Sequence, residues 1–246
     1  MVGGGVSSVD IANDISPFAN TIYQSTRNSE FDLVESMLPK NGIRVNEISH
    51  LEIHNHGDGL SDDEPLPLAV HFENGQSLHG IDMIMLCTGY HITFPYLEAY
   101  HSDETPLQEA DENVLITDGT QVHNLHKDIF YIPDPTLLFV GLPHYTFTFS
   151  VFDFQAIVVA QVLSGTVPLP TAAEMRLEYN AKVEKVGLGK VFHSIRGTEE
   201  KYVDDLLVWV NTSRAAQELV PIKGFSPRWY EAKEALRQKY RAQINK

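Results

Sequence analysis

The chain has 246 residues and a formal net charge of −15 at pH 7, with 33 acidic residues against 18 lysines and arginines. That charge repels nucleic-acid phosphates and anionic lipid, so neither is an expected partner. Hydrophobic residues make up 43% of the sequence, which is enough for a globular chain with a substantial core.

The compartment is indicated by cysteine content and by the lack of apolar spans. A single cysteine, Cys87, excludes an internal disulfide and a cysteine-based zinc site, and it fits a reducing compartment. The most apolar region, residues 137–163, is interrupted by Pro143 and Asp153 and is not expected to span a membrane. No charged-then-apolar leader opens the chain. We therefore expect a cytoplasmic protein.

The first dozen residues predict a strand end, a glycine turn and the start of a helix. Gly3 permits the turn, Gly5 lets a pyrophosphate approach the backbone, and Ser8 is small enough for close packing of helix on strand. The helix N-terminus directs N–H groups and a positive dipole end towards phosphates. This pattern favours dinucleotide binding over a glycine-rich turn without a ligand. The strand in front of the turn is reduced to Met1-Val2.

Residues 21–25 predict a second parallel strand, one βαβ step after the turn. Sites for NAD and FAD usually place an acid after this strand, whereas sites for NADP place an arginine there. Here Ser25, Thr26 and Arg27 follow, so we expect Arg27 to pair with a 2′-phosphate while the two hydroxyls donate hydrogen bonds. The alternative is a solvated surface arginine.

Short β signals come next, at residues 45–48, 51–54 and 68–72, and Asn74-Gly75 predicts a type I′ hairpin. Residues 81–87 predict a strand buried on both faces, because they are apolar nearly throughout. Polar, proline-rich sequence then runs to about residue 135. Another buried strand is predicted at 137–141, followed by helices at 150–163, 172–186, 199–216 and 226–244.

Three motifs at this spacing resemble those of the flavin-containing monooxygenase family: Gly3 to Asp10, Ser25-Thr26-Arg27, and Cys87-Thr88-Gly89-Tyr90. The family has an upstream glycine fingerprint for FAD and a downstream one for NADPH. The glycine turn of this chain resembles the downstream one, because an arginine follows it. Residues 138–165 resemble the segment that returns to the FAD domain, and Gln155 stands where that segment approaches the flavin.

The resemblance implies an α/β fold in two parts. Residues 1–87 would form a Rossmann-like NADPH-binding lobe, and residues 88–246 the C-terminal half of an FAD-domain lobe with a helical tail. The implied cofactors are NADP and FAD, with the FAD site incomplete because the upstream fingerprint is absent. The implied cofactor contacts are Gly3, Gly5, Val6, Ser7, Ser8, Ser25, Thr26, Arg27, Thr88, Gly89 and Gln155.

The implied activity is that of an NADPH-dependent monooxygenase, in which a C4a-hydroperoxyflavin oxygenates a nitrogen or sulfur nucleophile. The missing fingerprint makes this chain resemble a truncated, C-terminal portion, whose own catalytic residues stay unknown. The alternative is a non-catalytic NADP-binding fragment or partner protein without FAD. Its uncovered apolar surface around residues 137–163 leaves self-association open.

Other residues are weaker candidates for a metal, substrate or flavin contact. His54 and His56 lie two apart on a predicted strand, but no third ligand is evident, so no metal site is expected. His144 and Tyr145 could face a substrate or flavin, or simply pack in a loop. For Gln155 an interhelical or capping role remains the alternative to contact with FAD.

Overall fold

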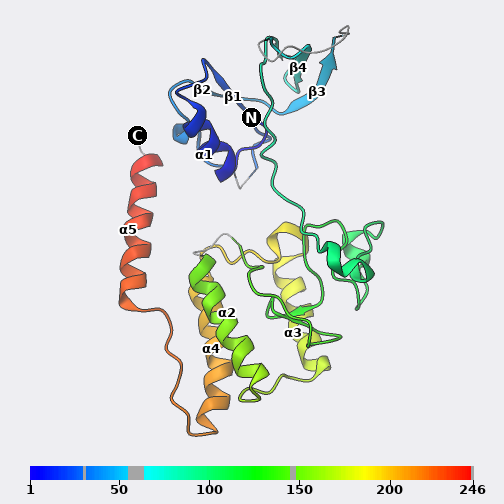
Figure 1. Cartoon of the computed structure of the whole chain (residues 1–246), viewed down its shortest axis with the longest axis vertical. Helices are drawn as coiled ribbons and strands as arrows, with labels where there is room; N and C mark the ends of the chain where they lie inside the picture. Colours follow the sequence, from blue (N-terminus) through cyan, green and yellow to red (C-terminus); the bar gives the residue numbers. More distant parts are fainter. Residues whose placement is uncertain (30–31, 55–63, 145–147, 245–246) are drawn as a thin grey trace. The chain divides into compact units, whose positions relative to one another are not determined.

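The structure is a computed structural model that describes residues 1–29, 32–54, 64–144 and 148–244. It divides into two units, which are described separately. The first comprises Met1–Tyr90 and Glu231–Lys246, and the second comprises His91–Tyr230. Helices and strands occur in both parts of the α/β chain (Figure 1). The last helix, α5 (Pro227–Ile244), begins in the second unit and continues into the first.

The first unit contains a small parallel sheet flanked by one helix. Strand β1 (Ile22–Ser25) pairs in parallel with β2 (Gly42–Val45). Val2 forms parallel bridges on both sides, to Ser25 and to Leu86. The order across the sheet is therefore β2, β1, Val2 and Leu86, which is the strand order of a Rossmann half with a very short central strand.

Helix α1 (Val6–Ile15) follows the glycine turn, as predicted. Its buried face is formed by Ser8, Val9 and Ala12, which recur at helical spacing. A turn at residues 16–18 follows the helix, and Asn41 holds it by donating to the Ser16 and Ala19 carbonyls at 3.1 and 2.8 Å.

A three-stranded antiparallel sheet completes the first unit: β3 (Ile48–Ile53), β4 (Leu68–Phe72) and β5 (Ser77–Leu78). The hairpin predicted at Asn74-Gly75 is confirmed, but the predicted type I′ turn is wrong. Gly75 has φ +81°, whereas Asn74 is not among the residues with positive φ. The loop has three residues, and its glycine takes the left-handed position, so the type I′ condition of two positive φ angles is not met.

The predicted strand at residues 81–87 is not a strand along its length. Its pairing is limited to the bridge at Leu86, with Val2 N–H donating to Met85 at 2.8 Å and Cys87 N–H donating to Val2 at 2.7 Å. Met83 and Leu86 are exposed. An apolar run forms a strand only where a partner strand lies beside it, and among the described residues this stretch has a β-bridge to Val2 alone.

The second unit is mainly helical. It contains α2 (Thr148–Leu163), α3 (Ala172–Val186) and α4 (Glu199–Ala215), at the predicted places. Helices α2 and α4 lie side by side (Figure 1), and Val158 packs with Leu206 and Val210 in a shared core. Among the described helices, none combines the length and apolarity that crossing a bilayer would require.

Two elements of the second unit differ from the prediction. Residues 137–141 are not a buried strand: Leu138 forms one antiparallel bridge to Phe130, and Val140 is exposed. The polar stretch before them contains the hairpin β6 (Leu125–His126) and β7 (Phe130–Tyr131). Most of residues 121–132 are buried, and several of their polar side chains, such as Gln121, Asn124 and Asp128, hydrogen-bond inside the fold. Short 3₁₀ helices occur in both units: Glu35–Met37 in the first, and Pro95–Tyr100, Leu107–Glu109 and Gly189–Val191 in the second.

Candidate nucleotide-binding site

The three sequence motifs meet at Gly3, although they lie up to 85 residues apart in the chain. Gly3 N–H donates to the Ser25 carbonyl at 2.9 Å, which joins the glycine turn to the end of β1. Gly3 has φ +114°, and a Cβ there would lie 2.3 Å from the Cys87 carbonyl oxygen. Only glycine fits this position, because it must admit both the left-handed backbone and the close approach of the Cys87-Thr88 peptide.

Gly5 serves a different purpose from Gly3. It is the N-cap residue of α1 with φ −80°, and a Cβ there would meet nothing within 4 Å. The space in front of Gly5 is therefore open. The first turn of α1 has no side-chain cap and no acidic residue. The N–H groups of Val6, Ser7 and Ser8 stand at a helix start that favours an anion.

Ser8 occupies the third position of the motif and joins the helix to the sheet. It is fully buried and accepts a 2.9 Å hydrogen bond from the Gln24 amide. The Arg44 guanidinium on β2 donates to the Gln24 side-chain oxygen, Oε1, at 2.7 and 3.1 Å. This Arg44–Gln24–Ser8 chain satisfies three polar groups beneath the turn. The sequence does not point to Arg44 or Gln24, because a lone polar residue on each of two strands gives no pattern.

Ser25, Thr26 and Arg27, at the end of β1, differ in burial and in internal hydrogen bonding. The Ser25 hydroxyl donates to the Asn46 carbonyl at 2.9 Å, and Thr26 N–H donates to Val45 at 3.3 Å. Both residues are buried. Arg27 is exposed. The structure therefore uses Ser25 to hold the strand end, and Arg27 is the residue of the three whose side chain reaches solvent.

Asp32 was not anticipated and lies against the turn. A Cβ on Gly4 would lie 2.5 Å from the Asp32 carboxyl carbon, and Leu33 N–H donates to the Gly4 carbonyl at 2.8 Å. The Asp32 carboxylate accepts from Ser29 N–H at 3.0 Å. An acid beside the turn opposes a bound anion, whereas the helix N-terminus and the exposed Arg27 favour one.

Thr88 and Gly89 lie at the same corner as Gly3. Both are exposed, and Gly89 has φ +90° with open space around a virtual Cβ. The Cys87 carbonyl that packs on Gly3 fixes where these two residues leave the sheet. The first unit thus brings together the glycine turn, the end of β1 and the Thr88-Gly89 pair.

Gln155 belongs to the second unit and is engaged within it. It is fully buried on α2; its oxygen accepts from Gly141 N–H at 2.9 Å, and its amide donates to the Tyr202 hydroxyl at 2.7 Å. Tyr202 in turn donates to the Lys127 carbonyl at 2.8 Å. These contacts match the interhelical alternative for Gln155.

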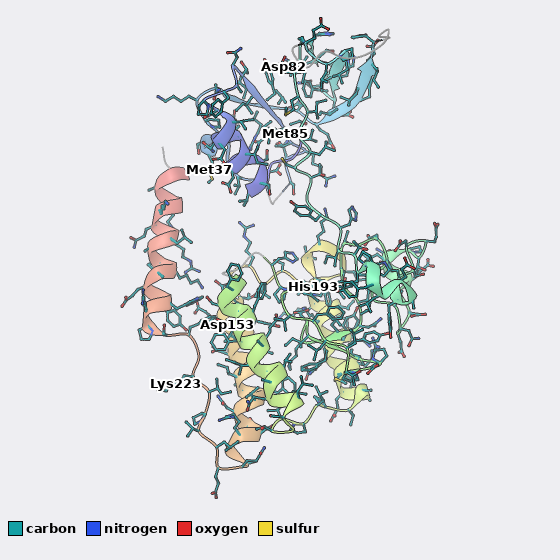
Figure 2. All side chains as sticks on the ribbon, in the orientation of Figure 1. Met37, Asp82, Met85, Asp153, His193 and Lys223 are labelled. Atoms are coloured by element: carbon teal, nitrogen blue, oxygen red, sulfur yellow. The ribbon has the colours of Figure 1, made fainter. Side chains whose placement is uncertain are left out.

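A buried ionic cluster is the strongest electrostatic feature of the second unit. Asp128 accepts from Lys182 at 2.6 and 2.8 Å and lies 2.8 Å from Nδ1 of His193 (Figure 2 labels His193). Burial alone would raise the pKa of Asp128, but the Lys182 charge and the His193 hydrogen bond hold this pKa well below its usual range. His193 also accepts from Val122 N–H at 3.1 Å. All of these groups are used in packing the fold.

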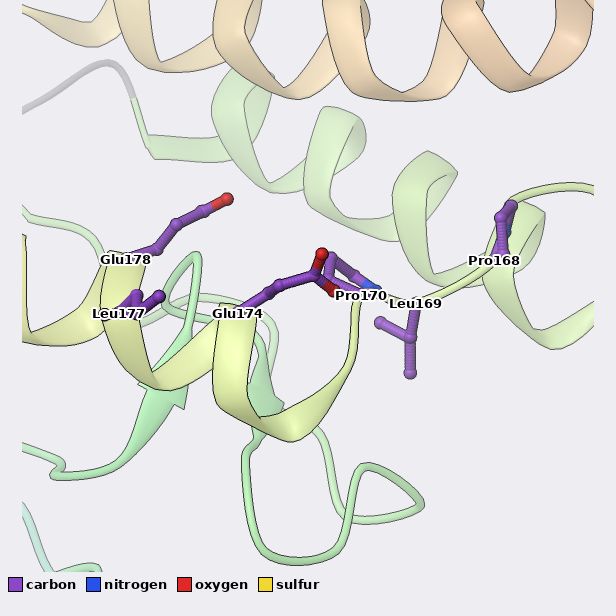
Figure 3. Close-up of a pocket in the computed structure, with 6 residues that line it drawn as sticks. All are labelled: Pro168, Leu169, Pro170, Glu174, Leu177 and Glu178. Atoms are coloured by element: carbon purple, nitrogen blue, oxygen red, sulfur yellow. The ribbon is translucent and has the colours of Figure 1, made fainter.

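Other candidate positions offer no site. His56 and Tyr145 lie outside the described residues. His144 lies 2.9 Å from the Lys190 carbonyl, and burial lowers its pKa. In the part of the chain that the structure describes, no group of three metal-ligating side chains gathers. Figure 3 shows a pocket lined in part by Glu174 and Glu178. Its volume is about 460 Å³, and none of the predicted residues lines it.

Comparison with known proteins places these features in context. A family model described as "Flavin-binding monooxygenase-like" matches residues 66–220. The flavin-containing monooxygenase ustF2 of Aspergillus flavus is 85% identical over 247 residues, covering 100% of this chain and 50% of that protein. Flavin-containing monooxygenase ustF1 of the same organism is 38% identical, covering 98% and 44%.

The fold is shared with solved structures. The S-allyl-L-cysteine S-oxygenase from Allium sativum superposes with a TM-score of 0.64 at 24% identity, covering 100% of this chain and 50% of that one. Tmm from Pelagibacter sp. strain HTCC7211 gives a TM-score of 0.56 at 21% identity, covering 83% and 40%. The chain spans about half the length of the relatives it matches.

Proposed function

The chain belongs to the flavin-binding monooxygenase-like family, and we propose that its first unit supplies the NADPH-binding part of a flavin-dependent monooxygenase. NADPH would provide the electrons and the flavin would supply the oxygen chemistry, and a nitrogen or sulfur nucleophile would be the substrate. The residues of this chain would bind and orient the nucleotide.

The observation that carries the proposal is the convergence at Gly3. Three motifs far apart in sequence share one corner, where Gly3 bonds Ser25 and packs on Cys87. Beside that corner, the space that a Cβ on Gly5 would occupy is empty, and helix α1 begins without a side-chain cap. A glycine turn serving only as a turn would not need an unfilled helix N-terminus beside it.

Within this corner the residues have separate roles. The N–H groups of Val6 and Ser7 would bind the pyrophosphate, because the Gly5 side is open. Arg27 would pair with the 2′-phosphate that distinguishes NADPH from NADH. The Ser25 hydroxyl and the Thr26 N–H donate to carbonyls at the end of β2, and these bonds would position Arg27. Thr88 and Gly89 would border the nucleotide.

Gln155, a predicted flavin contact, is engaged within the second unit. Its oxygen accepts from Gly141 N–H, and its amide donates to the Tyr202 hydroxyl. Opening those bonds would leave buried polar groups unsatisfied. Contact between Gln155 and the flavin is therefore not part of the proposed function.

The first test concerns nucleotide choice. We expect Arg27→Ala to weaken NADPH binding far more than NADH binding, since one charge-assisted pair is worth ~1.5–3 kcal/mol, or about 10- to 150-fold in Kd. Isothermal titration calorimetry with both nucleotides measures the difference. Lys40→Ala, another exposed cation of the same unit, is the matched control and should change neither affinity. Equal losses for both nucleotides in Arg27→Ala would contradict the role of Arg27.

A second variant separates binding from folding at the turn. Gly5 has a negative φ and open space, so Gly5→Ala should leave the free energy of unfolding nearly unchanged. The added methyl group would occupy the approach of the pyrophosphate and weaken NADPH and NADH alike. Unchanged affinity for both nucleotides would place the ligand elsewhere.

A further inference from the structure

One face of the three-stranded sheet in the first unit gathers histidines from strands that are distant in sequence. The register pairs His50 on β3 with His71 on β4, and His71 with Ser77 on β5. Strands β3 and β4 lie side by side (Figure 1). Residues two apart on a strand share a face, so His54 and His79, which directly follow β3 and β5, continue this face. The face therefore carries two pairs of histidines.

The rings of His54 and His79 are the available ones. Both side chains are exposed, and within the described ranges neither ring has a hydrogen-bond partner. His71, by contrast, has Nδ1 2.9 Å from the Ser77 hydroxyl and Nε2 3.0 Å from the Glu52 carboxylate. A metal ion needs a ring nitrogen with a free lone pair, so His54 and His79 meet this need and His71 does not.

The His54 and His79 rings approach each other over the middle strand. Strands β3 and β5 both pair with β4 and not with each other. Their backbones are therefore about 10 Å apart, which is two strand spacings. The two ring centroids are only 6.4 Å apart, with 11° between the ring planes, so both side chains extend inwards over β4. Ala69 occupies this face of β4, and its short side chain is fully buried.

This separation fits two imidazoles bound to one metal ion. With a metal–nitrogen bond of about 2.0–2.1 Å, the ion lies about 3.2 Å from the centre of each ring. Two rings on opposite sides of the ion are then about 6.4 Å apart, whereas two rings at a tetrahedral angle are about 5.3 Å apart. The observed 6.4 Å matches opposite positions. Square-planar or tetragonal ions provide such positions, and tetrahedral Zn²⁺ does not.

The charge around the pair favours a cation. Between Arg44 and Lys127 the sequence contains no lysine or arginine. Glu52 lies on the same face of β3, two residues before His54. An ion bound to the pair therefore has a carboxylate nearby, and this long segment supplies no ammonium or guanidinium group to repel it.

We propose that His54 and His79 bind one divalent transition-metal ion of tetragonal preference, Cu²⁺ or Ni²⁺. Water would complete the coordination, because no group of three metal-ligating side chains gathers in the described part of the chain. The bound ion would join the ends of β3 and β5 across β4 and so stabilise the sheet. The sequence pattern pairs His54 with His56, which lies outside the described residues, whereas the sheet pairs it with His79. The pair does not depend on the proposed nucleotide site.

Cu²⁺ binding to the full 246-residue chain tests the proposal at about pH 7.5, where unperturbed imidazoles are neutral. Isothermal titration calorimetry measures the affinity, with Cu²⁺ supplied as its glycine complex to suppress weak binding to scattered surface groups. Electron paramagnetic resonance identifies the ligands, and we expect a tetragonal signal with splitting from two imidazole nitrogens. Ni²⁺ should bind more tightly than Zn²⁺, because the two rings hold opposite positions.

Matched variants locate the ion. His54→Asn and His79→Asn each remove one ligand, and each should weaken Cu²⁺ binding at least about tenfold and remove one nitrogen from the resonance signal. His50→Asn removes an exposed histidine from the same face and should change neither the affinity nor the signal. Circular dichroism checks that all three variants fold like the parent chain.

The proposal would be overturned by the absence of Cu²⁺ binding in competition with glycine, by an affinity that His79→Asn leaves unchanged, or by Zn²⁺ binding more tightly than Ni²⁺. A loss in His50→Asn equal to that in His79→Asn would also contradict it. Loss of binding in His56→Asn with none in His79→Asn would assign the ion to the neighbouring pair in the sequence. These measurements use no nucleotide, so a failure of NADPH binding would count against the nucleotide site alone.

Discussion

At Gly3 and Gly5 one residue type meets two different requirements within three positions. Gly3 is glycine because its backbone has φ +114° and because the Cys87 carbonyl leaves no room for a Cβ. Gly5 has an ordinary φ and open space in front of it. The first glycine is therefore needed by the fold, whereas the second keeps an approach open. The sequence pattern anticipates both, because it encodes a turn followed by a helix start.

Two buried histidines make stability sensitive to acid. Burial lowers the pKa of His123 and of His126 from 6.5 to about 4. Both ring nitrogens of His126 lack a hydrogen-bond partner among the described residues, and Nδ1 lies 3.5 Å from the Glu178 carboxylate. The folded state therefore keeps these rings neutral at pH values where the unfolded chain protonates them.

The sign of the effect follows from proton uptake. Between pH 6.5 and pH 4 the unfolded state binds protons that the folded state does not, so the free energy of unfolding falls as the pH drops through this window. Each histidine contributes at most ~1.4 kcal/mol per pH unit. Urea unfolding at pH 7, 6 and 5 measures this slope. We expect His126→Phe to flatten it, and the exposed His50→Phe to leave it unchanged; identical slopes for His126→Phe and the parent chain would contradict the buried neutral state.

At the scale of elements, the turn between β6 and β7 shows what sequence reasoning missed. Lys127 and Asp128 both have positive φ, +53° and +59°, and Ile129 N–H donates to the His126 carbonyl at 3.0 Å. These are the φ signs that type I′ requires, yet the residues are not the expected Asn-Gly. Asp tolerates the left-handed region better than most residues, and tertiary contacts hold the turn in place.

Those contacts centre on Asp128 and give an element-scale prediction. Asp128→Ala would leave Lys182 and His193 without their shared acceptor and would remove the ion pair between the β6–β7 hairpin and α3. We expect it to lower the free energy of unfolding by about 3 kcal/mol. Chemical denaturation of the second unit measures the loss. Asp128→Asn keeps a hydrogen-bond acceptor and the turn geometry and should cost less. Asp205→Ala, which removes an exposed pair with Lys201 on α4, should cost less than about 1 kcal/mol. Similar losses for Asp128→Ala and Asp205→Ala would count against the cluster.

Helices were anticipated better than strands, for a physical reason. Residues 172–186 carry a capping box, in which Thr171 and Glu174 bond each other's backbone, and such signals are local. Residues 81–87 and 137–141 are equally apolar, but an apolar run becomes a strand only if a partner strand lies beside it. That partner is distant in sequence, so the local pattern does not reveal whether one is present.

At the scale of the whole molecule, cofactor content follows from what the described residues offer. The first unit contains the glycine turn at residues 3–5, and in the second unit the Gln155 side chain bonds Gly141 and Tyr202. We expect the purified 246-residue chain to bind NADPH, to show no flavin absorbance and to catalyse no NADPH oxidation. Absorbance spectra and an oxidation assay with added FAD test this. Stoichiometric flavin that survives gel filtration would contradict it.

The sequence by itself determined the family, the α/β class, the position of most helices and the glycine turn, because those depend on local spacing and on motifs of a few residues. Only the tertiary structure decided that Ser25 and Gln155 are occupied by internal hydrogen bonds while Arg27 reaches solvent. It also decided that Gly3 joins three distant motifs. Pairing, burial and close approach are relations between distant segments, and a linear pattern does not contain them.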